Sequence, residues 1–325
     1  MQPHAAGPQF IGPHAALGGG MVRAVDRARA IGATAIQVFG DNPTAWRRRS
    51  EPPVEAAAFR RRLVEHDIAP VAIHAAYLVN LAGPEPDFFE RSINVLTADL
   101  QAAWAFNGRF VNVHIGSHRD TSPAAGVARV AEGIERVFAA LPEGPEAPQL
   151  VLENAAGGGW AVGVTIAELA LLAEAITARG IPRHRVGFCL DTAHLWGAGY
   201  RISDPTVIND LLDDFEASVG RDRLSMIHLN DSKAPLGSRL DRHEHIAAGQ
   251  IGAPGLGHLL REPRLARVPF YLETPGMDQG YDGVNLARAL DLAAGREVGP
   301  LPPEAFTLKG SRSRAVHPVD ADEPS

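Results

Sequence analysis

The sequence contains one cysteine, few aromatic residues and no long apolar run. The single cysteine, Cys189, excludes an internal disulfide framework and is typical of a reducing compartment, so we expect a cytoplasmic protein. No run of about 18 apolar residues occurs, which argues against a membrane partner. The N-terminus lacks the basic and apolar regions of a signal peptide. Neither a phosphate-binding P-loop nor an HExxH zinc helix is present.

The charge balance is acidic. The formal net charge is −7 over 325 residues, which by itself argues against a general nucleic-acid binder because phosphate contacts need local cations. This argument counts neither bound metal ions nor local patches of charge. A length of 325 residues and 45% hydrophobic content allow one large α/β barrel or two medium domains.

Short apolar segments alternate with helical patterns along most of the chain. Each crossover through a helix returns the chain to the same end of a sheet, so the alternation predicts a parallel sheet. Eight such units predict a (β/α)8 TIM barrel of the α/β class. The predicted strands are Gln9–His14, Thr34–Phe39, Pro70–His74, Phe110–His114, Gln149–Glu153, Arg185–Asp191, Leu224–Ile227 and Val268–Glu273.

The predicted helices lie between these strands and after the last one. They are Leu17–Ile31, Val54–His66, Asp87–Phe106, Pro123–Leu141, Thr165–Arg179, Asp204–Val219, Leu256–Arg261 and Val284–Ala294. We therefore expect a flexible leader at residues 1–8 and one barrel domain at residues 9–294. The remaining residues, 295–325, show no periodicity, and we expect them to be disordered.

Possible metal ligands stand at, or just beyond, the ends of six predicted strands. In a TIM barrel the carboxyl ends of the strands converge on one rim, so residues far apart in sequence meet there. Asp241 and His243 also share one side of an extended segment, because their spacing is i, i+2. The nine predicted ligands are His74, His114, Glu153, Asp191, His194, His228, Asp241, His243 and Glu273.

Nine ligands are too many for one zinc ion, which takes about four. With three or four ligands per ion and some sharing, the set predicts two or three ions. Four carboxylates and three divalent ions together leave about two positive charges, which favours a phosphodiester substrate. Clustered divalent ions are suited to in-line phosphoryl displacement.

Several segments resemble the endonuclease IV family of type-2 AP endonucleases. These segments are HAAYLVNL, VNVHIGSH, LENAAGGG, CLDTAHLWGAGY, HLNDSKAPLGSRLDRHE and LETPG, and the resemblance extends from about Phe10 to Gly276. It implies a TIM barrel with three zinc ions, manganese being an alternative at one or more sites. It also implies a deoxyribonuclease that cuts double-stranded DNA 5′ to abasic sites, or at 3′-blocked sites, and leaves a 3′-hydroxyl. We expect a monomer.

The resemblance also implies a role for each ligand. A hydroxide bridging the metal ions would attack phosphorus, with Glu273 and Glu153 as catalytic carboxylates. His14 would orient a metal ligand without binding metal itself. It could equally be a polar residue at a strand end whose hydrogen bonds are satisfied. The implied ligands are His74 and His114 for the first ion, Glu153 between the first and second, Asp191, His228 and Glu273 for the second, and His194, Asp241 and His243 for the third.

The DNA-binding loops match the family less closely than the ligands do. Tyr77 aligns with a tyrosine that stacks in the gap left by the extruded nucleotide, although it could simply pack on the rim. Arg47 is a candidate phosphate contact, or else part of a solvated helix face. Thr44 and Gly158 stand where the family often has a basic residue and a glutamine. These departures affect lesion specificity rather than the metal chemistry.

Two other functions remain open at this point. Sugar isomerases and epimerases of the xylose-isomerase-like barrels share the architecture but use one or two ions in a carboxylate-rich set. A barrel that binds damaged DNA without cutting it is the other alternative. The number of metal ions per chain separates the first from an endonuclease, and cleavage of an abasic duplex separates the second.

Overall fold

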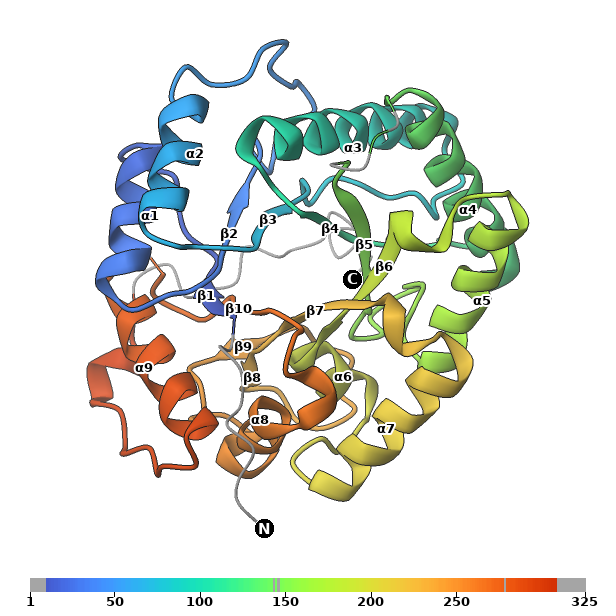
Figure 1. The fold of residues 1–325 in the computed structure, drawn as a ribbon. Coiled ribbons are helices and arrows are strands. Elements are labelled where there is room, and N and C mark those ends of the chain that lie inside the picture. The colour runs from blue at the N-terminus through green and yellow to red at the C-terminus, as the bar shows by residue number, and fades with distance from the viewer. Residues whose placement is uncertain (1–9, 143, 145–146, 278, 309–325) are drawn as a thin grey trace, which may run out of the picture.

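A computed structural model describes residues 10–142, 144, 147–277 and 279–308. Eight parallel strands form a nearly closed barrel with the helices around its outside (Figure 1). The predicted TIM barrel is therefore confirmed. The barrel strands are β1 (Ile11–Pro13), β2 (Ile36–Phe39), β3 (Val71–His74), β4 (Phe110–His114), β5 (Gln149–Glu153), β6 (Val186–Asp191), β7 (Leu224–His228) and β10 (Phe270–Leu272).

The first two strands close the barrel. Along the sheet the order is β1-β10-β7-β6-β5-β4-β3-β2, so β1 and β2 are its two ends. A parallel bridge joins His14 to Gln37, and the backbone N–H of Ala15 donates to the carbonyl of Gln37 at 2.7 Å. Closure brings the residues after β1 next to those on β2 and β10.

The helices pack on the outer surface of the barrel and bury its apolar face. Their positions follow the predicted alternation. The helices are α1 (Met21–Ala30), α2 (Ala56–Glu65), α3 (Pro86–Phe106), α4 (Pro123–Ala139), α5 (Ile166–Ala178), α6 (Thr192–Ala198), α7 (Pro205–Ser218), α8 (Gly252–Arg261) and α9 (Tyr281–Ala293). No helix of the described residues is long and apolar enough to cross a membrane.

Some element boundaries differ from the prediction. Helix α1 begins at Met21, after Gly19 and Gly20 adopt positive φ angles of 94° and 110°, and the Met21 N–H donates to the Glu55 carboxylate at 3.0 Å. Helix α8 begins four residues before the predicted start at Leu256, since its glycines and Pro254 weakened the helical pattern.

Three of the short elements that were not predicted lie close to the ligands. Helix α6 follows β6 directly, and β8 (Asp231–Ser232) pairs antiparallel with β9 (His243–Glu244). Asp191 caps α6, accepting a hydrogen bond from the backbone N–H of His194 at 2.8 Å. Elements of two to seven residues are too short to show a periodicity in sequence.

The barrel interior is built in layers, because alternate residues of each strand point inward. The lower layer is mostly apolar: Ala35, Ala72, Phe110, Val151, Cys189, Met226 and Tyr271 form one buried cluster. The residue two positions later on each of these strands is polar: Gln37, His74, Asn112, Glu153, Asp191, His228 and Glu273. The apolar layer therefore forms the floor beneath a polar one, and Cys189 belongs to that floor.

The structure describes part of the predicted C-terminal segment but none of the predicted leader. The expected leader, residues 1–8, lies outside the described residues. Within the segment expected to be disordered, helix η4 (Pro303–Phe306) forms and Ala305 is buried. That expectation is therefore wrong for this part of the segment, because a few tertiary contacts hold it without any periodic pattern. Residues 309–325 lie outside the described residues.

Candidate metal centre

The structure brings all nine predicted ligands together at the carboxyl end of the barrel. Six are at or directly after the end of a barrel strand, one is on α6, and two are at or just before β9. Among the described residues, three groups have ligand atoms within 4.8 Å of one another. These groups are His74, His114 and Glu153; Asp191, His194 and His243; and Glu153, Asp191, His228 and Glu273.

Asp241 completes the second group. Its carboxylate oxygens lie 3.3 Å from Nε2 of His194 and 2.9 Å from Nε2 of His243. The antiparallel pairing of β8 with β9 holds this segment over the barrel mouth. The predicted third ion therefore has its three implied ligands in one place.

Two carboxylates belong to more than one group. Glu153 is shared between the group of His74 and the group of His228, as the resemblance implied. Asp191 is within reach of both His228 and His243, at 3.8 and 3.7 Å, whereas the prediction assigned it to one ion. Sharing of this kind places the three groups side by side, so ions bound there would be neighbours.

Several ligand atoms suit metal binding because the folded chain leaves them without a hydrogen bond. Among the described residues, buried atoms of this kind include Oε1 of Glu153, Nδ1 of His228, Oδ1 of Asp241 and Nε2 of His243. A buried polar atom without a partner costs free energy. A set of imidazole nitrogens and carboxylate oxygens is the kind that zinc and its neighbours accept, so these residues fit divalent ions.

Burial and mutual attraction shift the pKa values of the cluster. Burial lowers the pKa of His74 to about 4. Burial also acts to lower the pKa of His243, but the Asp241 carboxylate more than offsets it and raises that pKa to about 10. Burial would raise the pKa of Glu153, yet His228 and His114 hold it well below its usual range. A divalent cation takes over the role of the imidazole protons, so its binding releases protons.

The cluster is reached from one side. The side chains of Asp241, His114 and His243 are 29%, 22% and 19% exposed, whereas those of Glu153 and His228 are fully buried. A substrate therefore meets the group of His114 and the group of His243 first.

Four side-chain amides orient the ligands, and sequence reasoning missed them. Gln37 donates to Oε1 of Glu273 at 2.7 Å and contacts Nε2 of His228 at 3.0 Å. Asn112 donates to Glu153 at 2.5 Å, and Asn230 donates to Asp191 at 2.6 Å. Asn154 accepts from the Asp191 N–H at 2.6 Å.

A signal for two of these amides was present in the sequence. Gln37 in IQVF and Asn112 in VNVH are polar residues inside apolar strands. A buried polar residue needs a partner, so such positions indicate inward-facing contacts. His14 was predicted, and it lies where expected: its Nδ1 is 3.0 Å from Oε1 of Glu273.

Comparison with known proteins identifies the family. The model of the xylose isomerase-like TIM barrel family matches residues 25–296. A "Probable endonuclease 4" of Halothermothrix orenii is 36% identical over 281 residues, covering 86% of this chain and 99% of its own. Another, of Chloroflexus aurantiacus, is 37% identical over 292 residues, with 89% and 100% covered. The chain belongs to the endonuclease IV family.

Solved structures agree with this assignment. The crystal structure of endonuclease IV from Thermus thermophilus matches with a TM-score of 0.75 and 35% identity, covering 89% of this chain and 100% of that one. A D-tagatose 3-epimerase-like protein matches with a TM-score of 0.60 at 12% identity, with 85% of this chain and 96% of that one covered. The second likeness shows the shared barrel fold alone.

In this member of the endonuclease IV family, one aromatic ring lies beside the predicted metal ligands. Tyr77 is 40% exposed, and its ring centroid is 5.5 Å from His74 and 6.3 Å from His114. Its backbone N–H donates to the carbonyl of Pro43, in the loop that also carries Arg47. Both candidate DNA contacts therefore belong to neighbouring loops, and Arg47 is exposed there.

The two positions that depart from the family also lie at the rim. Thr44 is exposed, and its hydroxyl donates to Asn42 at 3.0 Å. At Gly158 a Cβ would lie 3.1 Å from the carbonyl oxygen of Arg239. A side chain at Gly158 would thus need the Arg239 loop to move by a few tenths of an ångström, so the two loops constrain each other.

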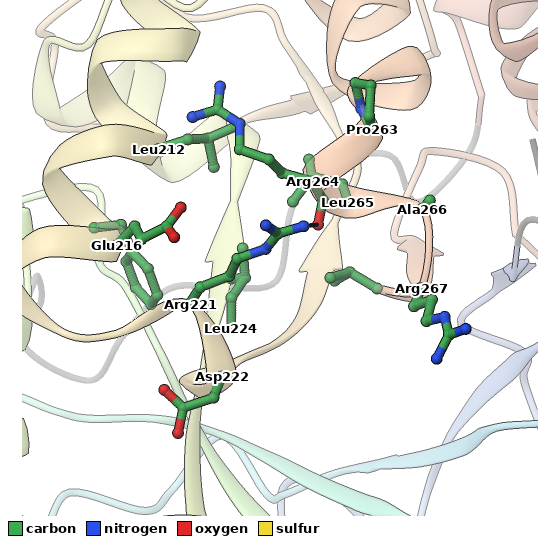
Figure 2. Close-up of a pocket in the computed structure, with 12 residues that line it drawn as sticks. Leu212, Glu216, Arg221, Asp222, Leu224, Pro263, Arg264, Leu265, Ala266 and Arg267 are labelled. Atoms are coloured by element: carbon green, nitrogen blue, oxygen red, sulfur yellow. Dashed lines mark hydrogen bonds between the residues drawn. The ribbon is translucent and has the colours of Figure 1, made fainter. Parts of the chain in front are cut away.

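A groove of about 660 Å³ lies elsewhere, at the amino ends of the strands. Figure 2 shows it beside Arg221, Leu224 and Arg264, with Nη2 of Arg221 donating to the Arg264 carbonyl at 3.2 Å. Since Leu224 is the first residue of β7, this groove is at the opposite end of the barrel from the ligands. It contributes no residue to the candidate metal centre.

Proposed function

We propose that this protein is a DNA-repair endonuclease that uses three zinc ions to hydrolyse the phosphodiester 5′ to an abasic site, and that it also acts on 3′-blocked ends. The observation that carries the proposal is the sharing of Glu153 and Asp191 among the three ligand groups. It supports a polynuclear centre rather than separate ions. The names of the relatives, which are endonucleases, support the reaction.

Each ligand then has one main role. His74 and His114 would hold the first ion, and Glu153 would be shared between the first and the second. Asp191 and Glu273 would hold the second ion together with His228. His194, Asp241 and His243 would hold the third, with Asp191 as an additional neighbour. Manganese is the alternative to zinc at one or more sites.

Bound divalent ions supply positive charge for the phosphate oxygens and make water acidic enough to ionise near neutral pH. The chain's own residues provide orientation. Glu153 and Glu273 are the catalytic carboxylates, and Gln37 and His14 fix the direction of Glu273. Asn112 fixes Glu153 in the same way. These hydrogen bonds allow one arrangement of oxygens around the reacting phosphate.

The DNA duplex would lie across the rim that Tyr77 and Arg47 occupy. Tyr77 is positioned to stack against bases next to the missing one, because its ring is exposed and braced against Phe39 at 5.3 Å. Arg47 would neutralise a backbone phosphate. A monomer suffices for this arrangement, since every ligand comes from one chain.

The test is cleavage of a duplex that contains one tetrahydrofuran abasic-site analogue, with the undamaged duplex as control. Elemental analysis of the purified protein accompanies it. We expect about three zinc ions per chain and cleavage that stops when a chelator is added. Three ions with no cleavage would reject the substrate, and one tightly held ion would favour a sugar isomerase or epimerase.

A further inference from the structure

The loop that follows β2, residues 40–49 (the β2 loop), is attached to helix α3. At its start, a Cβ built on Gly40 would lie 3.4 Å from Oδ1 of Asp99, so the backbone runs directly against this helix. Further along, the ring of Trp46 packs on the ring of Phe88, also on α3, with centroids 5.7 Å apart. The β2 loop therefore rests on α3 rather than standing free in solvent.

One arginine of the β2 loop turns inward, towards α3. Arg47 and Arg49 are exposed, whereas the side chain of Arg48 is only 9% exposed. Nη1 of Arg48 donates to the carbonyl of Asn42 at 2.7 Å, and its Nε lies 3.9 Å from Oδ1 of Asp99. The other buried nitrogens of Arg48, Nε and Nη2, have no hydrogen-bond partner among the described residues. The carboxylate of Asp99 therefore offsets part of the cost of burying this guanidinium.

The same carboxylate also holds the turn that carries Tyr77. Oδ2 of Asp99 accepts a hydrogen bond from the backbone N–H of Ala76 at 3.2 Å. The next N–H along the chain, that of Tyr77, donates to the carbonyl of Pro43 in the β2 loop at 3.1 Å. Asp99 thus uses one oxygen for each of the two segments that carry the candidate DNA contacts.

Asp99 makes these contacts at a cost to the stability of the fold. Burial raises its pKa to about 6 despite the nearby Arg48, so the ionised carboxylate destabilises the folded chain at neutral pH. An asparagine would avoid that cost and could still accept the hydrogen bond from Ala76. Buried charges that reduce stability are concentrated at functional positions, which favours a role for Asp99 beyond packing.

We propose that Asp99 is a positioning residue that, together with Arg48, fixes the β2 loop and the turn of Tyr77 relative to each other for DNA binding. The inference rests on the proposed function, because these two segments carry its DNA contacts, Arg47 and Tyr77. Arg48 and Asp99 do not contact DNA themselves, since both side chains are buried. They limit the arrangements that the two segments adopt before DNA binds, so less ordering has to occur on binding.

The test compares the parent with Asp99→Asn in steady-state cleavage of the abasic duplex. Asn keeps the acceptor for Ala76 but loses the attraction to Arg48, so we expect KM to rise about 5- to 30-fold, with kcat and metal content unchanged. Removal of a negative charge would by itself strengthen binding to DNA, and Asp99→Asn should be the more stable protein at pH 7.5. Weaker binding is therefore a result that neither general electrostatics nor loss of folding would give.

Matched variants separate the pair from other effects. Asp87→Asn makes the same change of charge at the exposed start of α3 and should not raise KM. Arg48→Gln should raise KM as Asp99→Asn does, whereas Arg48→Lys should retain part of the affinity because it keeps the charge. The double variant Asp99→Asn/Arg48→Gln should be no weaker than either single variant. An unchanged KM in Asp99→Asn, or additive effects in the double variant, would overturn the proposal.

Hydrogen exchange reports on the two segments without any substrate. In Asp99→Asn the backbone amide of Tyr77 should exchange about 5- to 30-fold faster, because its hydrogen bond to Pro43 opens more often. Unchanged exchange, or faster exchange with an unchanged KM, would overturn the positioning role. If the parent does not cleave the abasic duplex, the proposed reaction is rejected. Faster exchange together with weaker binding of the duplex would then still support the role of Asp99.

Discussion

Glu153 and His228 meet inside the barrel with Oε1 and Nδ1 3.3 Å apart, and neither atom makes a hydrogen bond within the described residues. The two residues come from β5 and β7, which are separated by β6 in the sheet. Both side chains are fully buried. Because a buried polar atom without a hydrogen bond is costly, these two facing atoms are suited to hold a cation between them.

Replacing the shared carboxylate should disable the centre. Glu153→Gln keeps the shape but removes the charge that two ligand groups share. We expect fewer metal ions per chain and a fall in cleavage of at least about 100-fold, because even residues that only orient ligands contribute 10- to 100-fold. The control Glu90→Gln makes the same change on the exposed surface. Unchanged metal content in Glu153→Gln would contradict the shared role.

The amide of Gln37 should matter without holding metal itself. Gln37→Leu removes the hydrogen bonds to Glu273 and His228, and we expect kcat to fall about 10- to 100-fold. Gln37→Glu should be at least as harmful, because it places a second carboxylate about 2.7 Å from Glu273. Gln149→Leu, at the other end of a barrel strand, is the matched control. Equal kcat in Gln37→Leu and the parent would reject the positioning role.

Metal removal should destabilise the fold as well as stop cleavage. Ions that bind only the folded chain stabilise it by about 4 kcal/mol when present at 1,000 times their dissociation constant. Treatment with a chelator should therefore lower the melting temperature in calorimetry, and added zinc should restore it. Chelator already saturated with zinc is the control. A melting temperature that does not respond would speak against a centre built into the barrel.

Stability should also depend on pH through Asp99 on α3. Burial raises the pKa of Asp99 from 3.8 to about 6, even though Arg48 lies 3.9 Å away. The folded chain thus holds this proton more tightly than the unfolded chain, so stability is lost as pH rises from about 4 to about 6. Relative to the parent, Asp99→Asn should gain about 1 kcal/mol of unfolding free energy between pH 5 and pH 7.5.

Urea unfolding of both proteins at the two pH values measures this difference. Asn can still accept the hydrogen bond from the Ala76 N–H, which Asp99 accepts at 3.2 Å. The comparison therefore isolates the charge. A stability difference that is the same at pH 5 and pH 7.5 would show that Asp99 does not titrate in this range.

The exposed ring of Tyr77 should contribute to the affinity of the protein for an abasic duplex. Tyr77→Ala removes the exposed ring, and base stacking is worth about 1–3 kcal/mol, so affinity for the abasic duplex should fall about 5- to 150-fold. Tyr77→Phe should retain most of it. Binding to undamaged duplex serves as the reference, and an equal loss for both duplexes would indicate a packing role at the rim instead.

Sequence alone determined the barrel, and it predicted the nine residues that the structure gathers at the carboxyl end of the strands. The eight predicted apolar strands indicated the fold. Ligand candidates such as His74 and Glu273 could be recognised because they stand at the ends of those predicted strands. A pattern of this kind depends only on residues close together in the chain, so it can be recognised without knowledge of tertiary contacts. The short elements α6, β8 and β9 could not be predicted, because tertiary contacts stabilise them and no local sequence pattern marks them.

Tertiary structure alone decided how the ligands are shared and oriented. Asp191 reaches two groups because β7 and the β9 segment approach it from different sides, and no spacing along the chain encodes that distance. The place of Gln37 between Glu273 and His228 depends on barrel closure, which joins strands more than 200 residues apart. Residues 297–308 have no periodic pattern, and only tertiary contacts such as the hydrogen bond from His245 to Ala305 place them against the barrel.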